Sequence, residues 1–475
     1  MRRRHVAFGI ALLIAITVLA PLVAQAREPV LTAGPRPYGS LFRALAGDTL
    51  EQDFGIGVIG FSHLTAAVAS RDIATTLLPQ GRGRNLQPQG GLVQDEGLNL
   101  NQLGLMICKG AGCPPGRLFE ANRNVLSRIT PLPGPRGNEV IIDWNLSAIY
   151  GEDAFFWKTK GFDDWDFDVR ERNKLAFTQW FLDIYLPVGA GASLLLGSFQ
   201  APLGNEIGYA FVPPNWFSAR TYAFAVSPAK HVGALVQFKL PETVGIASVS
   251  FGVVSDWSGV DFGSGDTQPG YIFAGSWRSA DMHTWLDLEV SYGNGEDDFG
   301  DVTIKDGVAR ALGGGSQFLA LSSTDEYLDR VVAFLNVTHR LDDNWRLAVE
   351  SAFGFQEGGD RAPLRFAIVR DSAFYGINGA LRYRLTDTLH AGARLEWFRD
   401  EQAANVLWSG VGAGGGDVYA LSVNLAWEPV PHILVRPELK YDVYDGEGSL
   451  FAVASNGIAR ADSQVLGVLN FELRF

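Results

Sequence analysis

The sequence predicts an all-β fold: a transmembrane, antiparallel, up-and-down β-barrel of about 16 strands, with short turns at one end and long loops at the other. The first observation is composition. The 475 residues include 55 Gly, 30 Phe, 13 Tyr and 12 Trp, but only 19% are charged, as expected of many short strands joined by turns. The second is a two-residue period of apolar and polar side chains from residue 54 onward, which is typical of strands. The third is an alternation of short and long connections, typical of outer-membrane barrels.

Composition also excludes other classes of protein. The apolar content of 47% is too high for a disordered chain. Beyond residue 26 no run of about 18 apolar residues occurs, which a membrane-spanning helix would need. A formal net charge of −13 argues against a nucleic-acid partner.

The N-terminus has the pattern of a secretory signal peptide. Arg2 to His5 are basic, Val6 to Val23 are apolar, and Ala24-Gln25-Ala26 is a small-x-small cleavage site. We expect residues 1–26 to be a signal peptide, 27–53 an N-terminal periplasmic segment and 54–475 the barrel. A retained signal anchor is the alternative, and the Ala-Gln-Ala end argues against it.

The two cysteines of the chain, Cys108 and Cys113, lie in the segment Cys-Lys-Gly-Ala-Gly-Cys. The intervening residues can close a small loop, and an exported chain folds under oxidising conditions. We therefore predict a disulfide between them. A metal site would need further Cys or His ligands, and the nearest histidine in the sequence is His63. We predict no metal and no cofactor.

The strand pattern is clearest at the C-terminus. One face carries Val465, Gly467, Leu469, Phe471, Leu473 and Phe475, and the other carries Gln464, Asn470, Glu472 and Arg474. Charges that alternate with large apolar residues indicate one face toward lipid and one toward water. A soluble β-sandwich is the alternative, but its strands are mostly shorter than these segments of about ten residues.

The same pattern places strands along the whole chain. They are predicted at 54–66, 98–108, 139–150, 175–186, 191–199, 231–240, 244–256, 269–278, 284–292, 330–340, 345–355, 372–385, 388–399, 417–427, 432–443 and 465–475. From the fourth strand on, short and long links alternate, and one earlier link, 109–138, is long on the predicted periplasmic side. Since backbone in hydrocarbon must satisfy its hydrogen bonds, the strands must close into a barrel. Roughly sixteen strands leave an aqueous lumen.

Candidate catalytic and metal-binding motifs have simpler explanations. Residues 412–416 are rich in glycine, but no strand-turn-helix context makes them a phosphate loop, and we interpret them as an outer loop. The acidic runs at 163–168 and 296–301 lack the spacing of a calcium loop. No His-Glu-x-x-His or Gly-x-Ser-x-Gly motif occurs. We predict that the chain is not an enzyme. The sequence does not exclude a nucleophile and a base placed on neighbouring strands.

Charges on the water face of the strands are the candidate pore-lining residues. The basic ones are Arg382, Arg384, Arg394, Arg436 and Lys440, the acidic ones are Asp143, Asp183, Asp287 and Glu289, and Glu396 and Glu438 interrupt the basic group. One interpretation is that any wet lumen collects charges. The other is a transverse field, in which basic and acidic walls face each other and set ion selectivity. The sequence leaves both open.

Residues 200–230 form a candidate constriction loop. Its apolar residues include Phe211, Trp216, Phe217, Tyr222, Phe224 and Val226, and so much apolar surface should pack against something. We predict that the loop folds into the lumen and narrows it, with Glu206 and Arg220 as its charged contributors. The alternative is that the aromatic residues cover a subunit interface or the outer rim of the barrel.

Several stretches resemble, in order, the OmpL-like putative β-barrel porin family. They are Leu98–Leu103, Ile142–Asp153, Asp183–Gly189, Leu196–Glu206, Asn215–Arg220, Pro228–Gly233 and Arg436–Asp442, and the resemblance covers most of residues 50–475. Phe475 resembles the C-terminal aromatic signal of bacterial outer-membrane barrels.

The resemblance implies a porin in the outer membrane of a Gram-negative bacterium, surrounded by lipid, that passes small hydrophilic solutes or ions by passive diffusion. A substrate-specific channel of the same architecture is one alternative, and a barrel-anchored enzyme or adhesin is another. The sequence specifies no subunit interface, so a homo-oligomer stays open.

Overall fold

A computed structural model describes most of the chain from Thr49 onward. The described ranges are 49–70, 72–73, 97–110, 138–157, 162–163, 173–206, 215–241, 245–255, 269–281, 283–296, 327–357, 371–401, 415–430, 432–447, 450–452 and 459–474. The expected signal peptide, Cys113 and Phe475 lie outside these ranges.

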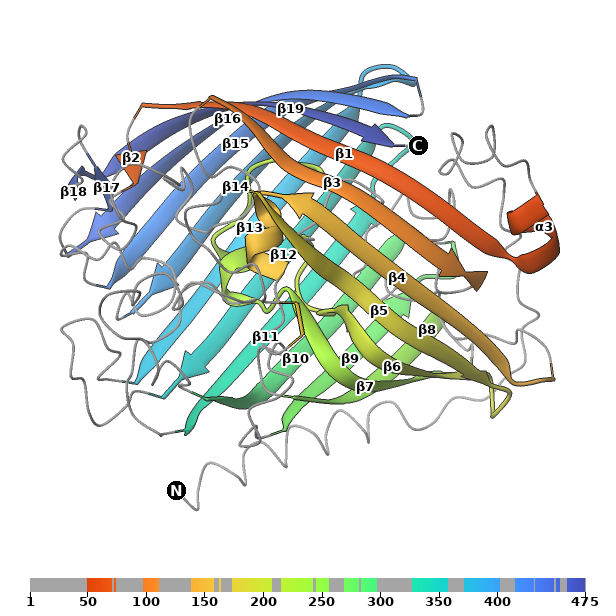
Figure 1. Ribbon diagram of the computed structural model, residues 1–475. Coiled ribbons are helices and arrows are strands. Elements are labelled where there is room, and N and C mark those ends of the chain that lie inside the picture. Colours follow the sequence, from red (N-terminus) through yellow and green to blue (C-terminus); the bar gives the residue numbers. More distant parts are fainter. Residues whose placement is uncertain are drawn as a thin grey trace.

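Sixteen strands form a closed barrel in which sequence neighbours pair side by side (Figure 1). They are β1 (Ile56–Ala69), β3 (Gly97–Lys109), β4 (Ile141–Gly151), β5 (Lys174–Leu186), β6 (Ala192–Gln200), β7 (Lys230–Lys239), β8 (Ile246–Val254), β9 (Gly270–Arg278), β10 (Thr284–Glu296), β11 (Tyr327–Arg340), β12 (Trp345–Gln356), β13 (Ser372–Arg384), β14 (Leu389–Asp400), β15 (Gly416–Val430), β16 (Ile433–Gly446) and β19 (Ser463–Arg474). All pairs are antiparallel, and β1 pairs with both β3 and β19. Closure leaves no strand edge unpaired, as a lipid environment requires.

The predicted fold class is confirmed, and each predicted strand has a counterpart. The largest differences lie at strand ends. β10 runs to Glu296 and β11 begins at Tyr327, beyond the predicted 292 and 330. The reason is pairing: Gly293 to Glu296, which the sequence suggests are loop, continue the ladder opposite Tyr327 to Arg330.

A small second sheet was not predicted. It is formed by β2 (Asp72–Ile73), β17 (Phe451–Ala452) and β18 (Ala459–Ala461) and joins the first outer link to the last one. Segments of two or three residues are too short to show a two-residue period. Their pairing follows from the barrel, which brings the two links together.

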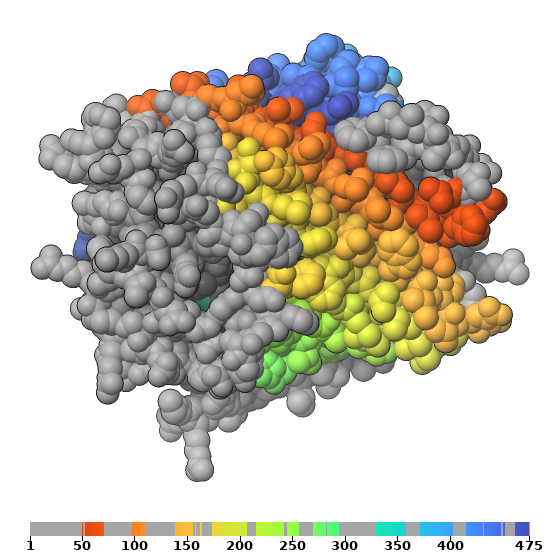
Figure 2. Space-filling model, in the orientation of Figure 1, coloured from red at the N-terminus to blue at the C-terminus, as the bar shows by residue number. Residues whose placement is uncertain are grey.

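The outward face of the barrel is apolar, and its side chains alternate with buried ones along each strand. Leu395 of β14 is 66% exposed, whereas Arg394 beside it is buried. Figure 2 shows one part of this surface, where the strands follow one another in sequence order from orange through yellow to green. An apolar face of this kind suits contact with acyl chains.

In the described part of the chain, three short helical segments accompany the strands. The α-helix α3 (Thr49–Phe54) precedes β1, and the 3-10 helices η3 (Asp153–Trp157) and η4 (Ala223–Val226) lie in the links after β4 and β6. Among the described residues, no helix is both long and apolar enough to cross a membrane.

Candidate functional site

Most of the predicted pore-lining charges are buried inside the barrel. Those with buried side chains are Asp143, Asp183, Asp287, Glu289, Arg394, Glu396, Arg436, Glu438 and Lys440. Arg382 and Arg384 are only partly buried, and Arg384 lies 3.8 Å from Asp387 in the turn after β13. These two arginines therefore belong to the mouth of the barrel at the short turns.

Cross-strand pairing sets the buried polar residues side by side in rows. Asp287, Asn336, Glu350, Asn378 and Glu396 are successive partners across β10 to β14. Acidic and amide side chains thus alternate around this part of the wall. Such regular spacing follows from strand register and needs no loop contact.

The link between β6 and β7, residues 201–229, crosses the lumen and is called the inner loop here; residues 201–206 and 215–229 of it are described. Two wall carboxylates accept hydrogen bonds from its backbone N–H groups. Glu438 of β16 accepts from Ser218 (2.7 Å) and Ala219 (2.9 Å). Glu396 of β14 accepts from Tyr222 and the residue after it, at 2.6 and 3.3 Å. Hydrogen bonds to ionised groups are the stronger kind, so these contacts fix the course of the loop.

Three wall cations bind backbone carbonyls of the same stretch. Arg394 donates to Ala219 (2.8 Å), Lys440 to Arg220 (3.1 Å) and Arg436 to Asn215. Lys440 also lies over the ring of Tyr222, at 4.6 Å from its centroid. Acidic and basic wall residues therefore work together, one set holding donors of the loop and the other its acceptors.

The first limb of the inner loop is held on the other side by β10 to β13. Glu289 accepts from the Gly204 N–H (3.2 Å) and from the Asn336 amide (2.7 Å). Glu350 accepts from the Asn205 N–H and from the Asn378 amide (2.8 Å). The amide side chains orient both carboxylates toward the loop.

Apolar packing anchors the loop as well. One buried cluster combines Leu203, Tyr222 and Val226 of the loop with Phe334, Phe374, Phe398 and Tyr444 of the wall and with Leu450 and Phe451 of the last outer link. Burial of several large side chains contributes roughly 1.5–3 kcal/mol each. Tyr222 thus packs against the lumen wall, whereas Phe211 lies outside the described residues.

Glu206 and Arg220 are the two loop charges predicted for the constriction. Glu206 accepts from Arg394 (2.6 Å) and from the N–H and hydroxyl of Thr221 (2.8 and 3.0 Å). Burial by itself would raise the pKa of Glu206, but Arg394 and Arg220 hold it below its ordinary value. Burial lowers the pKa of Arg220 to about 10, so Arg220 stays cationic at neutral pH.

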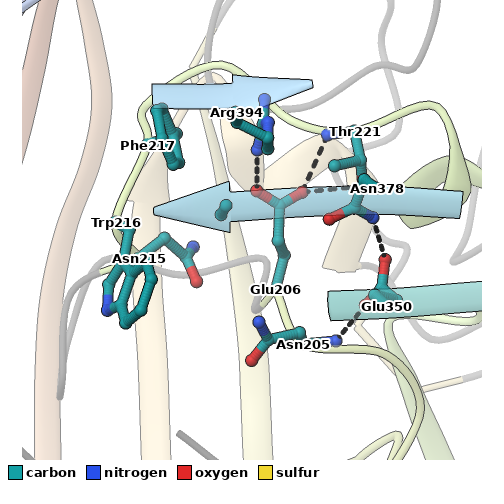
Figure 3. A pocket seen from close by; sticks show the side chains of 10 residues that line it. Asn205, Glu206, Asn215, Trp216, Phe217, Thr221, Glu350, Asn378 and Arg394 are labelled. Atoms are coloured by element: carbon teal, nitrogen blue, oxygen red, sulfur yellow. Dashed lines mark hydrogen bonds and ion pairs between the residues drawn. The ribbon is translucent and has the colours of Figure 1, made fainter. Parts of the chain in front are cut away.

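A small recess opens between the inner loop and β12 to β14, with room for little more than one water molecule. Figure 3 shows Glu206 at its centre, reaching Arg394 on one side, with Asn205 and Glu350 below. Trp216 and Asn215 lie at its other side. The recess therefore joins loop and wall residues that are distant in sequence.

The predicted walls of opposite charge are not cleanly separated. Arg394 and Lys440 lie on the same part of the wall as Glu396 and Glu438, and all four contact the inner loop. Asp287 is paired with Arg278 of β9 at 3.0 Å. Much of the wall charge is thus paired or bonded to the loop.

Cys108 lies near the end of β3. Cys108 is disulfide-bonded and fully buried. Its pairing with Cys113 stays a prediction, because Cys113 is not among the described residues. Over those residues, no group of three His, Cys, Asp or Glu side chains is placed to hold a metal ion.

Sequence reasoning missed several residues that shape the lumen. Glu350, Asn378 and Asn424 contact the loop or its anchors, and Asp153 of η3 accepts from Gln102 of β3 at 2.7 Å. Glu350 and Asn378 share the strand face of other charged residues, so the two-residue period could have revealed them. Nothing in the sequence indicates the contact of Asp153.

Comparisons with known proteins give a family and several similar folds. The model of a family described as "Putative beta-barrel porin-2, OmpL-like" matches residues 117–475. No match is found among curated proteins.

Similar solved structures include an anion-selective porin from Comamonas acidovorans, with 10% identity, a TM-score of 0.48 and coverage of 88% of this chain and 99% of that one. The outer-membrane channel DcaP of Acinetobacter baumannii has 9% identity, a TM-score of 0.49 and coverage of 88% and 97%. OmpF of Salmonella typhi in complex with daunomycin has 10% identity, a TM-score of 0.48 and coverage of 88% and 97%.

Proposed function

The chain belongs to the OmpL-like family of putative beta-barrel porins, and from this membership we propose how its lumen controls the passage of solutes. The protein is an outer-membrane porin, a channel for passive diffusion of small hydrophilic solutes or ions. The observation that carries the proposal is the inner loop, which is bonded to carboxylates and cations of the barrel wall inside the closed barrel.

We propose that the inner loop narrows the pore. Sixteen strands alone leave a wide aqueous channel. The bonds from β10, β12, β14 and β16 to the loop backbone support a fixed constriction, because a backbone held by ionised partners resists displacement. Glu206 and Arg220 are then the loop charges nearest to the passing solute.

The wall charges have a second role in this proposal. Arg394, Glu396, Arg436, Glu438 and Lys440 position the loop, and Glu289 also holds it through the Gly204 N–H. Asp143 and Asp183 add negative potential to other parts of the wall, where Asp287 is paired with Arg278. Arg382 and Arg384 act at the mouth on the side of the short turns. Rings of charge of this kind set ion selectivity.

The remaining assignments follow from export to the outer membrane of a Gram-negative cell. Residues 1–26 are proposed to be a cleaved signal peptide, 27–53 a periplasmic segment and 54–475 the barrel. The Cys108–Cys113 disulfide would close the start of the long periplasmic link. Lipid surrounds the apolar outer face. This face could also carry the contacts of a homo-oligomer.

Membership in a family of porins favours a protein that performs no chemistry. The competing possibilities are a channel specific for one substrate and a barrel that anchors an enzyme or adhesin. Planar-bilayer recording from the purified full-length protein distinguishes them. We expect steady open-channel currents, which a closed barrel of an enzyme or adhesin would not give.

A further inference from the structure

Basic side chains gather on the inner face of β11 to β14, where these strands approach the short turns. Arg340, Arg346 and Arg382 are successive partners in one cross-strand row, Arg340 opposite Arg346 and Arg346 opposite Arg382. Arg384 follows Arg382 on the same face, and its partner across the next pair is His390 of β14. These five residues, called the basic patch here, lie on neighbouring strands (Figure 1).

The basic patch faces the lumen beside the inner loop. Side chains two residues apart share a strand face, so Arg346 and Arg382 lie on the face of the buried residues Ala348 and Ala380. These two alanines pack against Phe217 of the inner loop. Every member of the patch is partly exposed. A solute that passes between the inner loop and the short-turn mouth therefore meets the patch.

The side chains of the patch converge on one region. The charges of Arg382, Arg346 and Arg384 all act on the imidazole of His390. Directly opposite residues have Cβ atoms about 4.5–5.5 Å apart, and like charges at such positions are destabilising. An anion bound between the guanidinium groups would relieve this repulsion. The patch therefore attracts a counter-ion from the lumen.

The acidic neighbours of the patch leave it accessible to a solute. Arg340 pairs with Asp343, which is 78% exposed, and Arg384 lies 3.8 Å from Asp387, which is 97% exposed. Ion pairs as exposed as these contribute little, so an incoming anion can replace them. β12 and β13 are described over their whole length: β13 contains no acidic residue, and the one in β12, Glu350, already binds the inner loop.

Guanidinium groups also select the class of anion. The planar fork of arginine donates two parallel hydrogen bonds to a phosphate or carboxylate group, whereas a chloride ion has a single atom to accept them. Guanidinium groups of opposite residues can bind different oxygens of one such group. We infer that the basic patch is a binding site for the oxyanion group, phosphate or carboxylate, of a small solute. The inference rests on the proposed function, because the site acts on solutes that pass through the lumen.

The test is the effect of inorganic phosphate on the chloride current through the full-length protein in planar bilayers, at constant ionic strength. Phosphate bound at the patch should lower the current in a saturable way. Arg346→Gln and Arg382→Gln should each raise the half-blocking phosphate concentration about threefold to tenfold, because a charged donor is lost. Arg382→Lys keeps the charge but lacks the fork, so it should also weaken the blockade, which a general effect of charge would not predict.

Succinate, tested in the same way, distinguishes the two kinds of oxyanion. Blockade by both anions supports a site for either group, and blockade by one of them assigns that group. Heat-modified migration in gels identifies folded variants, and Arg382→Lys serves if the neutral variants do not fold.

The matched control is Arg399→Gln, since Arg399 lies on the outer face at the other end of β14 and is 40% exposed. It should leave the half-blocking concentration unchanged. A current without saturable blockade by either anion, or equal blockade in wild type and the folded patch variants, overturns the inference while the channel stands. If wild type carries no current, the proposed function fails. Equilibrium dialysis of radiolabelled phosphate then decides on the patch: wild-type binding that Arg382→Lys weakens supports it, and absent or unaltered binding overturns it.

Discussion

Several charged side chains in the lumen bind backbone groups of the inner loop. Glu438 accepts hydrogen bonds from two successive N–H groups of the loop. Arg394 donates hydrogen bonds to a loop carbonyl and to the carboxylate of Glu206. An irregular segment inside a barrel has backbone groups without ladder partners, and each must be bonded or solvated. The wall charges meet this need, which explains why acids and bases are interleaved there.

Replacement of Glu206 by Gln should shift ion selectivity toward anions. The change removes one negative charge beside Arg394 and Arg220. A unit charge about 4 Å from a passing ion contributes on the order of 1 kcal/mol in water, or about fivefold in local ion concentration. The zero-current potential across a KCl gradient measures the shift.

The control for this variant is Asp387→Asn, which removes the same charge from a turn side chain that is 97% exposed. It should leave the zero-current potential close to wild type. Equal shifts in the two variants would mean that Glu206 does not act at the constriction.

Asp153 should make the docking of η3 depend on pH. Burial raises the pKa of Asp153 from 3.8 to about 7, despite hydrogen bonds from Gln102 and Asn101. Because the folded-state pKa is raised, the protonated form stabilises the docked η3 fully below about pH 4, and this stabilisation is lost as pH rises toward about 7. Amide hydrogen exchange of residues 151–157, corrected for intrinsic rates, should be faster at the upper end of this window.

Asp153→Asn is the informative variant here, because it keeps the shape and cannot ionise. Its exchange rates should be slow and independent of pH over the same window. A pH dependence that persists in the variant would assign the effect to another group.

At the scale of single strands, Leu395→Arg should prevent stable insertion. Leu395 is 66% exposed on the lipid face, and a charge there costs about 2–4 kcal/mol near the bilayer midplane. Arg394→Leu, one residue away, should still insert, but with a loosened loop and altered conduction, because the pair with Glu206 is lost. Heat-modified migration in gels reports insertion, and similar behaviour of both variants would contradict the register of β14.

Deletion of Ile207 to Ala223 tests the inner loop as an element. The deleted stretch contains the N–H groups that bind Glu438 and both of those that bind Glu396. The folded deletion variant should show larger single-channel conductance and weaker ion selectivity. An unchanged conductance in a folded variant would rule out a constriction by this loop.

The strands could be predicted from the sequence, and the course of the loop only in outline. Each strand carries its own signal, since Leu395 and Arg394 must face opposite sides whatever the rest of the chain does. The aromatic residues of the loop, such as Tyr222, indicate packing against a surface. They cannot indicate that Glu438, more than 200 residues later, accepts the N–H groups of Ser218 and Ala219, because that contact depends on how the whole barrel closes.

At the scale of the whole molecule, closure joins the two ends of the chain. β1 and β19 pair over nine residues of β1, from Phe61 to Ala69. Glu472 lies inside this seam between Arg436 and Arg474, at 3.2 and 3.1 Å. Since Arg436 belongs to β16 and Arg474 to β19 itself, these pairs favour one register of β19 against β16, because a shift there would separate Glu472 from Arg436.

The last prediction concerns this seam. Ala66 and Leu469 are directly opposite partners that face lipid, so Ala66→Cys with Leu469→Cys should form a disulfide in the folded protein, in a background with Cys108→Ser and Cys113→Ser. Directly opposite residues have Cα atoms about 4.5–5.5 Å apart, within the range of a disulfide. Alkylation of the unfolded, unreduced variant should then label neither cysteine.

The matched control, Ala66→Cys with Phe471→Cys, is displaced by two residues on the same face, at a diagonal distance of about 7–8 Å, and should stay largely reduced. Preferential cross-linking of the control pair would show a shifted register, and labelling of both pairs would show a barrel that does not close between β1 and β19.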